Sequence, residues 1–134
     1  MKSFVQSRKQ FLASVFAALV AVVAAPHAVA ADPYPSKPVK IVVAFTAGGT
    51  TDILARAVGQ KLQEKLGQPF VIDNKPGAGG NLGTEFVVRS APDGYTLIVD
   101  SVGPIAINQT LYKNLSYDPL KDLVPIVQIA DVPN

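Results

Sequence analysis

The 134-residue chain contains no cysteine and only one histidine, His27. Without cysteine the chain can form neither disulfides nor cysteine-ligated zinc sites. We expect His27 to leave with an N-terminal leader, so the mature chain would contain no histidine either. Catalytic triads of the Ser–His–Asp and Cys–His kinds are therefore excluded. We predict that the chain has no nucleophilic active site, no metal site and no cofactor.

Basic residues are scarce outside the N-terminus. Residues 1–30 carry Lys2, Arg8 and Lys9 and no acidic residue, whereas the remaining part carries 9 Lys and Arg against 10 Asp and Glu, a net charge of −1. A nucleic-acid-binding domain needs a basic face on its folded part. We therefore predict that nucleic acid is not a partner.

The first 30 residues have the organisation of a signal peptide. A basic segment over residues 1–10 precedes an apolar run over residues 11–25 that only Ser14 interrupts. That run is shorter than the roughly 20 residues that span a bilayer, which argues against the alternative of an uncleaved membrane anchor. Ala28-Val29-Ala30 matches the small-x-small pattern that signal peptidase cleaves. We predict cleavage after Ala30 and a periplasmic mature protein.

The export route follows from the same segment. No cysteine follows the apolar run, so lipid attachment is excluded. Residues 7–12 resemble a twin-arginine signal in which lysine replaces the second arginine. This variant is weak evidence, and we favour the general secretion route.

Strand-like and helix-like segments alternate along the mature chain. After a proline-containing arm over residues 31–38, β-branched runs predict strands and apolar residues at helical spacing predict helices. Thr50 or Thr51 is expected to cap the first helix, and Gly67 to end it. The order predicts an α/β fold with a parallel sheet. The expected strands are 39–45, 70–73, 95–100 and 124–130, and the expected helices are 52–66, 81–90 and 105–112.

Three loops are expected at the carboxyl ends of the strands, where parallel sheets bind ligands. They cover residues 46–52, 74–81 and 101–108, and each combines small residues with the start of a helix. Helix N-termini offer free N–H groups and a positive dipole end. The loops therefore predict an anion-binding rim, although glycines that merely permit tight turns are the alternative.

Known phosphate-binding motifs do not fit these loops. The sequence contains no P-loop, and Gly77 to Gly83 comes close to a dinucleotide fingerprint whose third glycine is replaced by Leu82. We predict no nucleotide ligand.

Several segments in fixed order resemble one known family. They cover residues 34–45, 47–56, 66–69, 73–83, 91–97, 106–108 and 111–119, which is essentially the whole mature chain. They are similar to the Bug-type receptors, the extracytoplasmic solute-binding proteins of tripartite tricarboxylate transporters. The resemblance implies a periplasmic-binding-protein fold of the two-lobed, type II-like Venus-flytrap kind. Such a receptor closes around a small organic carboxylate and delivers it to membrane transporter subunits.

The resemblance also implies where the ligand binds. In this family the loop after the first strand contacts the ligand, a second contact region follows the third strand, and backbone amides and waters hold the carboxylates rather than an arginine. The anion-binding rim predicted from the three loops adds Gly79 and Asn81 of the middle loop to these family-derived candidates. The candidate ligand-binding residues are Phe45, Ala47, Gly48, Gly49, Thr50, Thr51, Asp52, Gly79, Asn81, Ser101, Val102 and Gly103. A di- or tricarboxylate, an amino acid or an aromatic acid would all suit them.

Family members are roughly twice as long as this chain. We therefore expect residues 31–134 to be an incomplete, truncated first lobe that binds ligand weakly or not at all alone. Two alternatives stay open. One is a non-binding receptor fragment, and the other is a small secreted enzyme that uses a pair of carboxylates, with Asp52 and Asp100 as the residues to test.

Overall fold

A computed structural model describes residues 33–131, and the signal peptide and cleavage site predicted at residues 1–30 lie outside this part. Three parallel strands form a sheet in the order β2-β1-β3. Strand β1 (Val39–Val43) is central, between β2 (Phe70–Asn74) and β3 (Thr96–Val99). The α/β class and the parallel sheet predicted from the sequence are confirmed.

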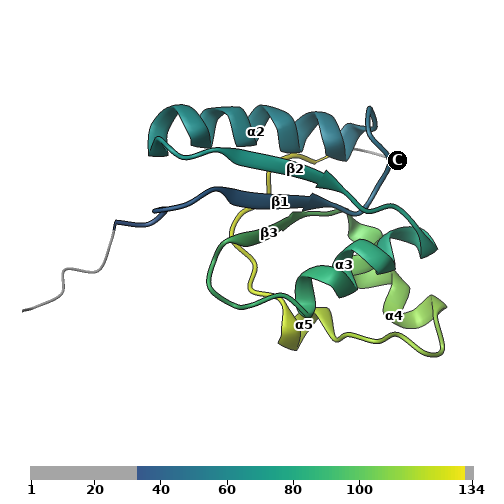
Figure 1. The fold of residues 1–134 in the computed structure, drawn as a ribbon. Helices are drawn as coiled ribbons and strands as arrows, with labels where there is room; N and C mark the ends of the chain where they lie inside the picture. The colour runs from purple at the N-terminus through teal and green to yellow at the C-terminus, as the bar shows by residue number, and fades with distance from the viewer. Residues whose placement is uncertain (1–32, 132–134) are drawn as a thin grey trace, which may run out of the picture. The chain divides into compact units, whose positions relative to one another are not determined.

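Helices cover the two faces of this sheet. Helix α2 (Thr50–Leu66) lies on one face, and α3 (Asn81–Val88) lies on the other (Figure 1). Val39, Ile41 and Val43 are buried on β1 and pack with Ala55 of α2 and Phe70 of β2. A continuous β-branched run suits a strand that is buried on both faces, which explains why β1 is the centre of the core.

Helical spacing predicts that the inward face of α2 is formed by Ile53, Leu54, Ala57, Val58, Leu62 and Leu66. Leu62 packs against the core, whereas Ile53 and Leu66 are 60% and 43% exposed, and Ala55 and Gly59 are buried instead. The side chains of Ile41 and Ile72 reach up to Gly59. Large residues on the strands and small residues on the helix thus fill the interface together. As predicted, α2 ends at Gly67, which has a left-handed conformation.

Helix α3 packs through small and polar residues. Asn81, Gly83 and Thr84 are buried, whereas Leu82 is 54% exposed and Phe86 is 37% exposed. Helical spacing predicts that Leu82, Phe86 and Val87 face inward, which is wrong for Leu82 and Phe86, whereas Val87 is half-buried. Gly83 lies directly against the backbone of Ala44, so the helix approaches β1 too closely for larger side chains to stand between them.

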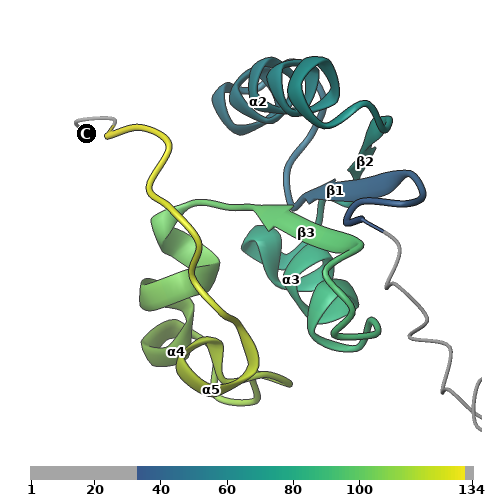
Figure 2. The same cartoon turned by 90° about the vertical axis from the view of Figure 1, so that its left-hand side faces the viewer.

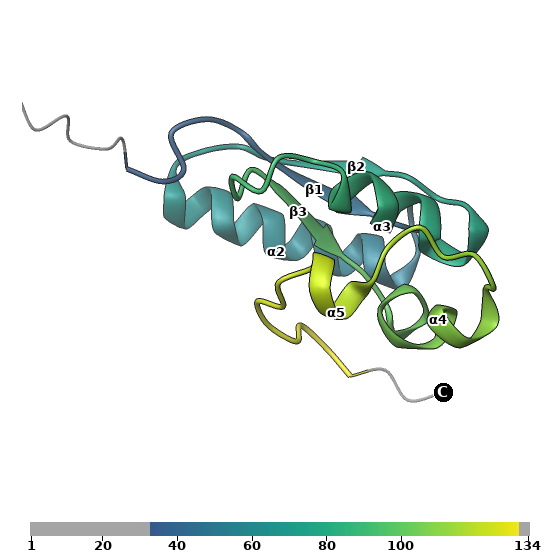
Figure 3. The same cartoon turned by 90° about the horizontal axis from the view of Figure 1, so that it is seen from below.

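Short helical segments follow β3. A π-helical turn η2 (Gly103–Ile107) continues into α4 (Asn108–Leu111), and α5 (Pro119–Asp122) comes later. They lie with α3 on the side of the sheet away from α2 (Figure 3). Helices α4 and α5 pack against η2, and η2 packs against the short 3-10 helix η1 (Ala78–Gly80). The helix predicted over residues 105–112 is thus present as η2 and α4, whereas α5 was not predicted.

The strand predicted over residues 124–130 is absent from the described part of the chain. This segment passes on the β3 side of the sheet and pairs with no strand (Figure 2). Val124, Ile126 and Val127 are 87%, 76% and 75% exposed. Apolar β-branched residues favour a strand only where a neighbouring strand and a packed face are available, and this segment has neither.

The arm before β1 is attached to the amino end of the sheet. The Tyr34 hydroxyl donates to the carbonyl of Gly94 (2.6 Å), the Ser36 N–H donates to the Tyr95 hydroxyl (3.0 Å), and Lys37 pairs with Asp93 (3.5 Å). Lys37 also lies over the Tyr95 ring. Within residues 33–131, no helix is both long and apolar enough to cross a lipid bilayer.

Candidate functional site

The loops that follow the three strands meet at the carboxyl edge of the sheet. The side chain of Asn74, the last residue of β2, donates to the carbonyl of Phe45 after β1 (3.1 Å). Gly80 has a φ of +94°, and a Cβ there would overlap the Pro104 ring and lie 3.2 Å from Phe45 Cζ. Close approach of the three loops therefore requires glycine at position 80. The sequence prediction that they share one edge is confirmed.

The first loop presents small, accessible residues. Ala47, Gly48 and Thr50 are exposed, and Gly49 and Thr51 are half-buried. Gly48 has a φ of +85° with open space around its Cα. Phe45 instead turns inward and packs against the core. The accessible surface of this loop is therefore mostly backbone.

Helix α2 begins at this loop without a side-chain cap. Its N-cap residue is Gly49, and no side chain accepts a hydrogen bond from the first turn. The cap predicted at Thr50 or Thr51 is wrong, because both residues already belong to the helix. Among residues 33–131, no acceptor receives the N–H groups of Thr50 and Thr51. The helix start therefore offers free donors and the positive end of a 17-residue dipole.

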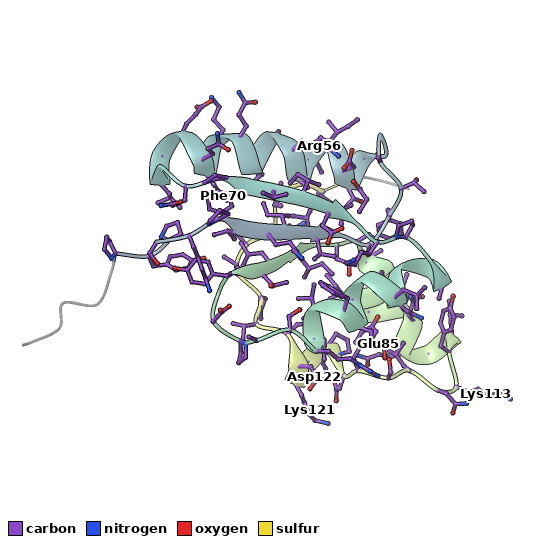
Figure 4. The ribbon with its side chains drawn as sticks, in the orientation of Figure 1. Arg56, Phe70, Glu85, Lys113, Lys121 and Asp122 are labelled. Atoms are coloured by element: carbon purple, nitrogen blue, oxygen red, sulfur yellow. The ribbon has the colours of Figure 1, made fainter. Side chains whose placement is uncertain are left out.

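Asp52 is buried beneath the first loop, with 2% of its surface exposed. Its carboxylate accepts hydrogen bonds from Arg56 Nε (2.9 Å), the Gly48 N–H (2.8 Å) and Asn74 Nδ2 (3.0 Å). These donors, Arg56 first, hold the pKa of Asp52 well below its usual range. Asp52 therefore remains charged and directs that charge at protein donors. Figure 4 shows Arg56 on α2, toward the carboxyl end of the sheet.

A buried amide network supports the middle loop. Gly79 is exposed, with a φ of +62°, and its carbonyl accepts from Asn108 Nδ2 (3.1 Å). Asn108 Nδ2 also donates to Asn81 Oδ1 (2.6 Å), which lies 3.0 Å from the Tyr117 hydroxyl. Asn81 is 8% exposed, so its side chain lies in the layer beneath the loop, whereas the Gly79 backbone reaches the surface.

The third loop begins at a half-buried carboxylate. Asp100 accepts hydrogen bonds from the Thr84 hydroxyl (2.7 Å) and the Ser101 N–H (2.8 Å). Burial raises the pKa of Asp100. Beyond it, Ser101 and Gly103 are half-buried and Val102 is 59% exposed. Val102 thus provides an apolar side chain beside the polar loops.

Asp52 and Asp100 belong to two separate clusters. Their hydrogen-bond partners differ completely, and both carboxylates are directed at protein donors. Within the described part, no group of three or more metal-ligating side chains gathers at one place. The arrangement suits the binding of an anion by N–H and hydroxyl donors.

Several residues that organise this edge were not among the candidates. Asn74 and Arg56 join the first two loops, and Thr84, Asn108 and Tyr117 join the second and third. Asn74 had a usable signal, since it is a polar residue immediately after a strand. The others lie inside helices or in a distant loop, and a sequence pattern does not show which loop a helical side chain reaches.

The parallel sheet, the helices on both faces and the loops at its carboxyl edge define an α/β lobe of the kind that binds ligands at that edge. Residues 54–134 match the family model described as the tripartite tricarboxylate transporter family receptor. Because this match covers more than half of the chain, the chain belongs to that receptor family. The resemblance to Bug-type receptors found in the sequence is thereby confirmed.

Relatives and solved structures agree with this assignment. Protein BugT of Bordetella pertussis is 46% identical over 112 residues, which are 83% of this chain and 34% of BugT. The structure of MatC from Rhodopseudomonas palustris with bound malate is 41% identical, with a TM-score of 0.69 over 72% of this chain and 33% of MatC. An R. palustris protein with adipate is 45% identical, with a TM-score of 0.63 over 65% of this chain and 29% of that one.

These matches also show how much of such a protein is present. The chain spans about a third of the length of the relatives that it matches, so these relatives are longer than the roughly twofold length expected from the resemblance. The periplasmic-binding-protein fold class is confirmed for that portion, since another similar structure is periplasmic binding protein BugD, 43% identical with a TM-score of 0.63 over 66% of this chain and 29% of BugD.

Proposed function

We propose that this chain provides the carboxylate-binding edge of a periplasmic solute receptor for a tripartite tricarboxylate transporter. One observation carries the proposal: three loops meet at the carboxyl edge of a lobe whose structural relatives include proteins solved with malate and adipate. In this chain the first of those loops exposes backbone and helix-start N–H groups, and none of the three loops contains arginine.

The proposed chemistry is anion binding by neutral donors. A ligand carboxylate lies at the start of α2, where the N–H groups of Thr50 and Thr51 and their hydroxyls are its donors. Oriented N–H groups at a helix start favour negative charge without a cationic side chain. Gly79 of the middle loop and residues 101–103 of the third loop contact the remaining part of the ligand. Val102 contacts the apolar part of the ligand.

The remaining parts of the proposal concern export and partners. The signal peptide is cleaved after Ala30, and the receptor delivers its ligand to the membrane subunits of the transporter. It binds the acid without converting it, in agreement with a family of receptors. A slight net negative charge in the mature part does not suit nucleic acid.

The test is a titration of the ¹⁵N-labelled mature protein with malate and with adipate, followed by NMR. We expect saturable shifts of the amide signals of Gly48 to Thr51, Gly79 and Ser101 to Gly103 for at least one acid. Binding in the millimolar range is sufficient, because a single lobe contacts only part of a ligand. The uncharged dimethyl ester of each acid is the control.

Two outcomes would contradict the proposal. One is the absence of shifts at these amides with every organic acid tried. The other is the appearance of a reaction product from the acid, which would favour the alternative of an enzyme that uses carboxylates.

A further inference from the structure

Asp52, Asn74 and Arg56 form a polar cluster beneath the first loop, which we call the Asp52 cluster. The Asn74 amide group donates to Asp52 Oδ1 (3.0 Å) and to the Phe45 carbonyl (3.1 Å), and its own oxygen accepts from Arg56 Nη2 (3.2 Å). The side-chain amide of Asn74 therefore has a partner for each donor and for its acceptor. The cluster is internally satisfied.

The Asp52 cluster holds the first loop at both of its ends. At the β1 end, Asn74 holds the Phe45 carbonyl, and at the helix end, Asp52 holds the Gly48 N–H. Only Thr46 and Ala47 lie between these two points. The same two side chains also join the loop to the end of β2. The cluster thus fixes the shape of the loop and its distance from the neighbouring loop.

The direction of the Asp52 carboxylate matters for the helix start. A side chain at this position can accept the N–H of the N-cap residue of its own helix. Asp52 instead accepts from Gly48, which precedes the N-cap residue Gly49. Gly49 has no side chain to cap the helix, and neither Asp52 nor any other protein acceptor within the described residues receives the N–H groups of Thr50 and Thr51.

Arg56 compensates the negative charge of Asp52 beneath the first loop. A buried carboxylate near a bound anion repels it unless a cation compensates the charge. The Arg56 guanidinium lies 2.9 Å from Asp52, and its side chain is 53% exposed on the outer side of the cluster. It compensates the charge of Asp52, and its hydrogen bonds go to Asp52 and Asn74 rather than to the first loop.

We propose that Asp52 is a positioning residue for carboxylate binding: with Asn74 and Arg56 it presets the first loop and keeps the donors at the start of α2 available. This inference rests on the proposed function. It assigns no ligand contact to the Asp52 carboxylate itself, since all the contacts of that group are with the protein.

The first test compares Asp52→Asn with the wild-type protein. The amide oxygen of asparagine can replace only part of the carboxylate, so the Gly48 N–H and the Asn74 amide lose charged acceptors. We expect the Gly48 amide to exchange with solvent at least tenfold faster. We also expect the dissociation constant for malate, the probe used, to rise about tenfold, the size of one lost hydrogen bond.

Asp93→Asn is the matched control. Asp93 also accepts a backbone N–H, that of Tyr95 (3.0 Å), and also pairs with a cation, but it lies at the amino end of the sheet. The same chemical change there can lower stability without reaching the site. The proposal requires unaltered malate binding in Asp93→Asn, even where its melting temperature falls as much as that of Asp52→Asn.

Arg56→Gln tests the electrostatic role through the salt dependence of malate binding, which a purely structural role of Arg56 would not change. It leaves the charge of Asp52 uncompensated, so malate binding should weaken, and the loss should diminish as salt is raised from 20 to 500 mM, because salt partly screens the repulsion between Asp52 and a ligand at the exposed surface of the loop. Arg56→Lys should restore part of the affinity. A loss that is independent of salt and not rescued by lysine would contradict the electrostatic role of Arg56.

The outcomes separate this inference from the proposed function. If the wild-type protein shows no response to malate, the proposed function fails, and amide exchange alone then decides the inference. Faster exchange confined to residues 46–51 in Asp52→Asn supports it. Unchanged exchange at Gly48, or equal loss of malate binding in Asp52→Asn and Asp93→Asn, overturns it.

Discussion

Two aspartates at the same edge of the sheet experience opposite environments. Asp52 is surrounded by donors that include a guanidinium, and its pKa is lowered. Asp100 is half-buried beside a threonine hydroxyl and one N–H, and its partial burial raises its pKa. Both residues lie at the carboxyl edge of the sheet, and the groups that reach them are what distinguishes their pKa values.

Asp52 should stabilise the fold at neutral pH and less so in acid. A carboxylate whose pKa is lower in the folded state contributes stability above its unfolded pKa, about 3.9. That contribution is lost as pH falls toward the folded pKa. Urea unfolding of wild type and Asp52→Asn at several pH values should show a constant difference above about pH 5 that shrinks below pH 4. A difference that grows in acid would contradict this.

Asp100 should show the opposite dependence. Because its pKa is raised in the folded protein, the folded state takes up a proton at a higher pH than the unfolded chain does. Wild type should therefore gain stability relative to Asp100→Asn as pH falls from 7 toward 4. The same urea series measures this, and a trend parallel to that of Asp52 would refute the assignment.

At the scale of elements, glycines set how closely each helix approaches the sheet. A Cβ on Gly59 would lie 3.4 Å from Ile72 Cδ1, an ordinary contact, whereas a Cβ on Gly83 would lie 2.8 Å from the Cα of Ala44. Both glycines lie within helices, where alanine is intrinsically favoured by roughly 0.5–1 kcal/mol. The two positions therefore differ in contacts rather than in helix propensity.

Alanine at the two positions should have opposite effects. Gly59→Ala should raise the free energy of unfolding by about 0.5 kcal/mol, because the helix gains and the contact is tolerated. Gly83→Ala should lower it by about 1–3 kcal/mol, because the backbone of β1 or α3 must shift. Parallel urea denaturation measures both, and stabilisation by Gly83→Ala would show that α3 can move away from β1 freely.

The elements that the sequence predicts well are those that local pattern determines. The β-branched run before Phe45 predicts β1, and Gly67 marks the end of α2. The strand expected at residues 124–130 failed because a strand needs a neighbour, which residue types do not show. The inward face of α2 was predicted only in part: Leu62 packs against the core, but large residues on the strands fill the space above Gly59.

At the scale of the whole molecule, the tail after α5 contributes little to the described fold. Ile126 and Val127 are 76% and 75% exposed. Serine at both positions should change the free energy of unfolding by no more than about 0.5 kcal/mol. The control Ile41→Ala, at a position that is 1% exposed, should cost about 2–5 kcal/mol. A loss above about 1 kcal/mol in the tail variant would show that the tail packs on the lobe.

The positions of the loops that form the candidate site were predictable from the sequence, but the side chains that connect these loops were not. Parallel strands place their following loops at one edge, so the three loops could be identified from element order alone. Which side chains connect them could not, because Asn108 and Tyr117 reach Asn81 across 27 and 36 residues of sequence. Such contacts depend on packing, and a single sequence does not encode them in any local pattern.

The arm at the amino end of the sheet has a practical consequence for handling this protein. Tyr34 and Ser36 hold the start of the lobe against Gly94 and Tyr95, at the end of the strands remote from the loops. A tag, dye or surface linker joined ahead of Tyr34 therefore begins on the side away from the proposed ligand edge. Immobilisation through that end should leave the loops facing the solution, which suits biosensor measurements with small organic acids.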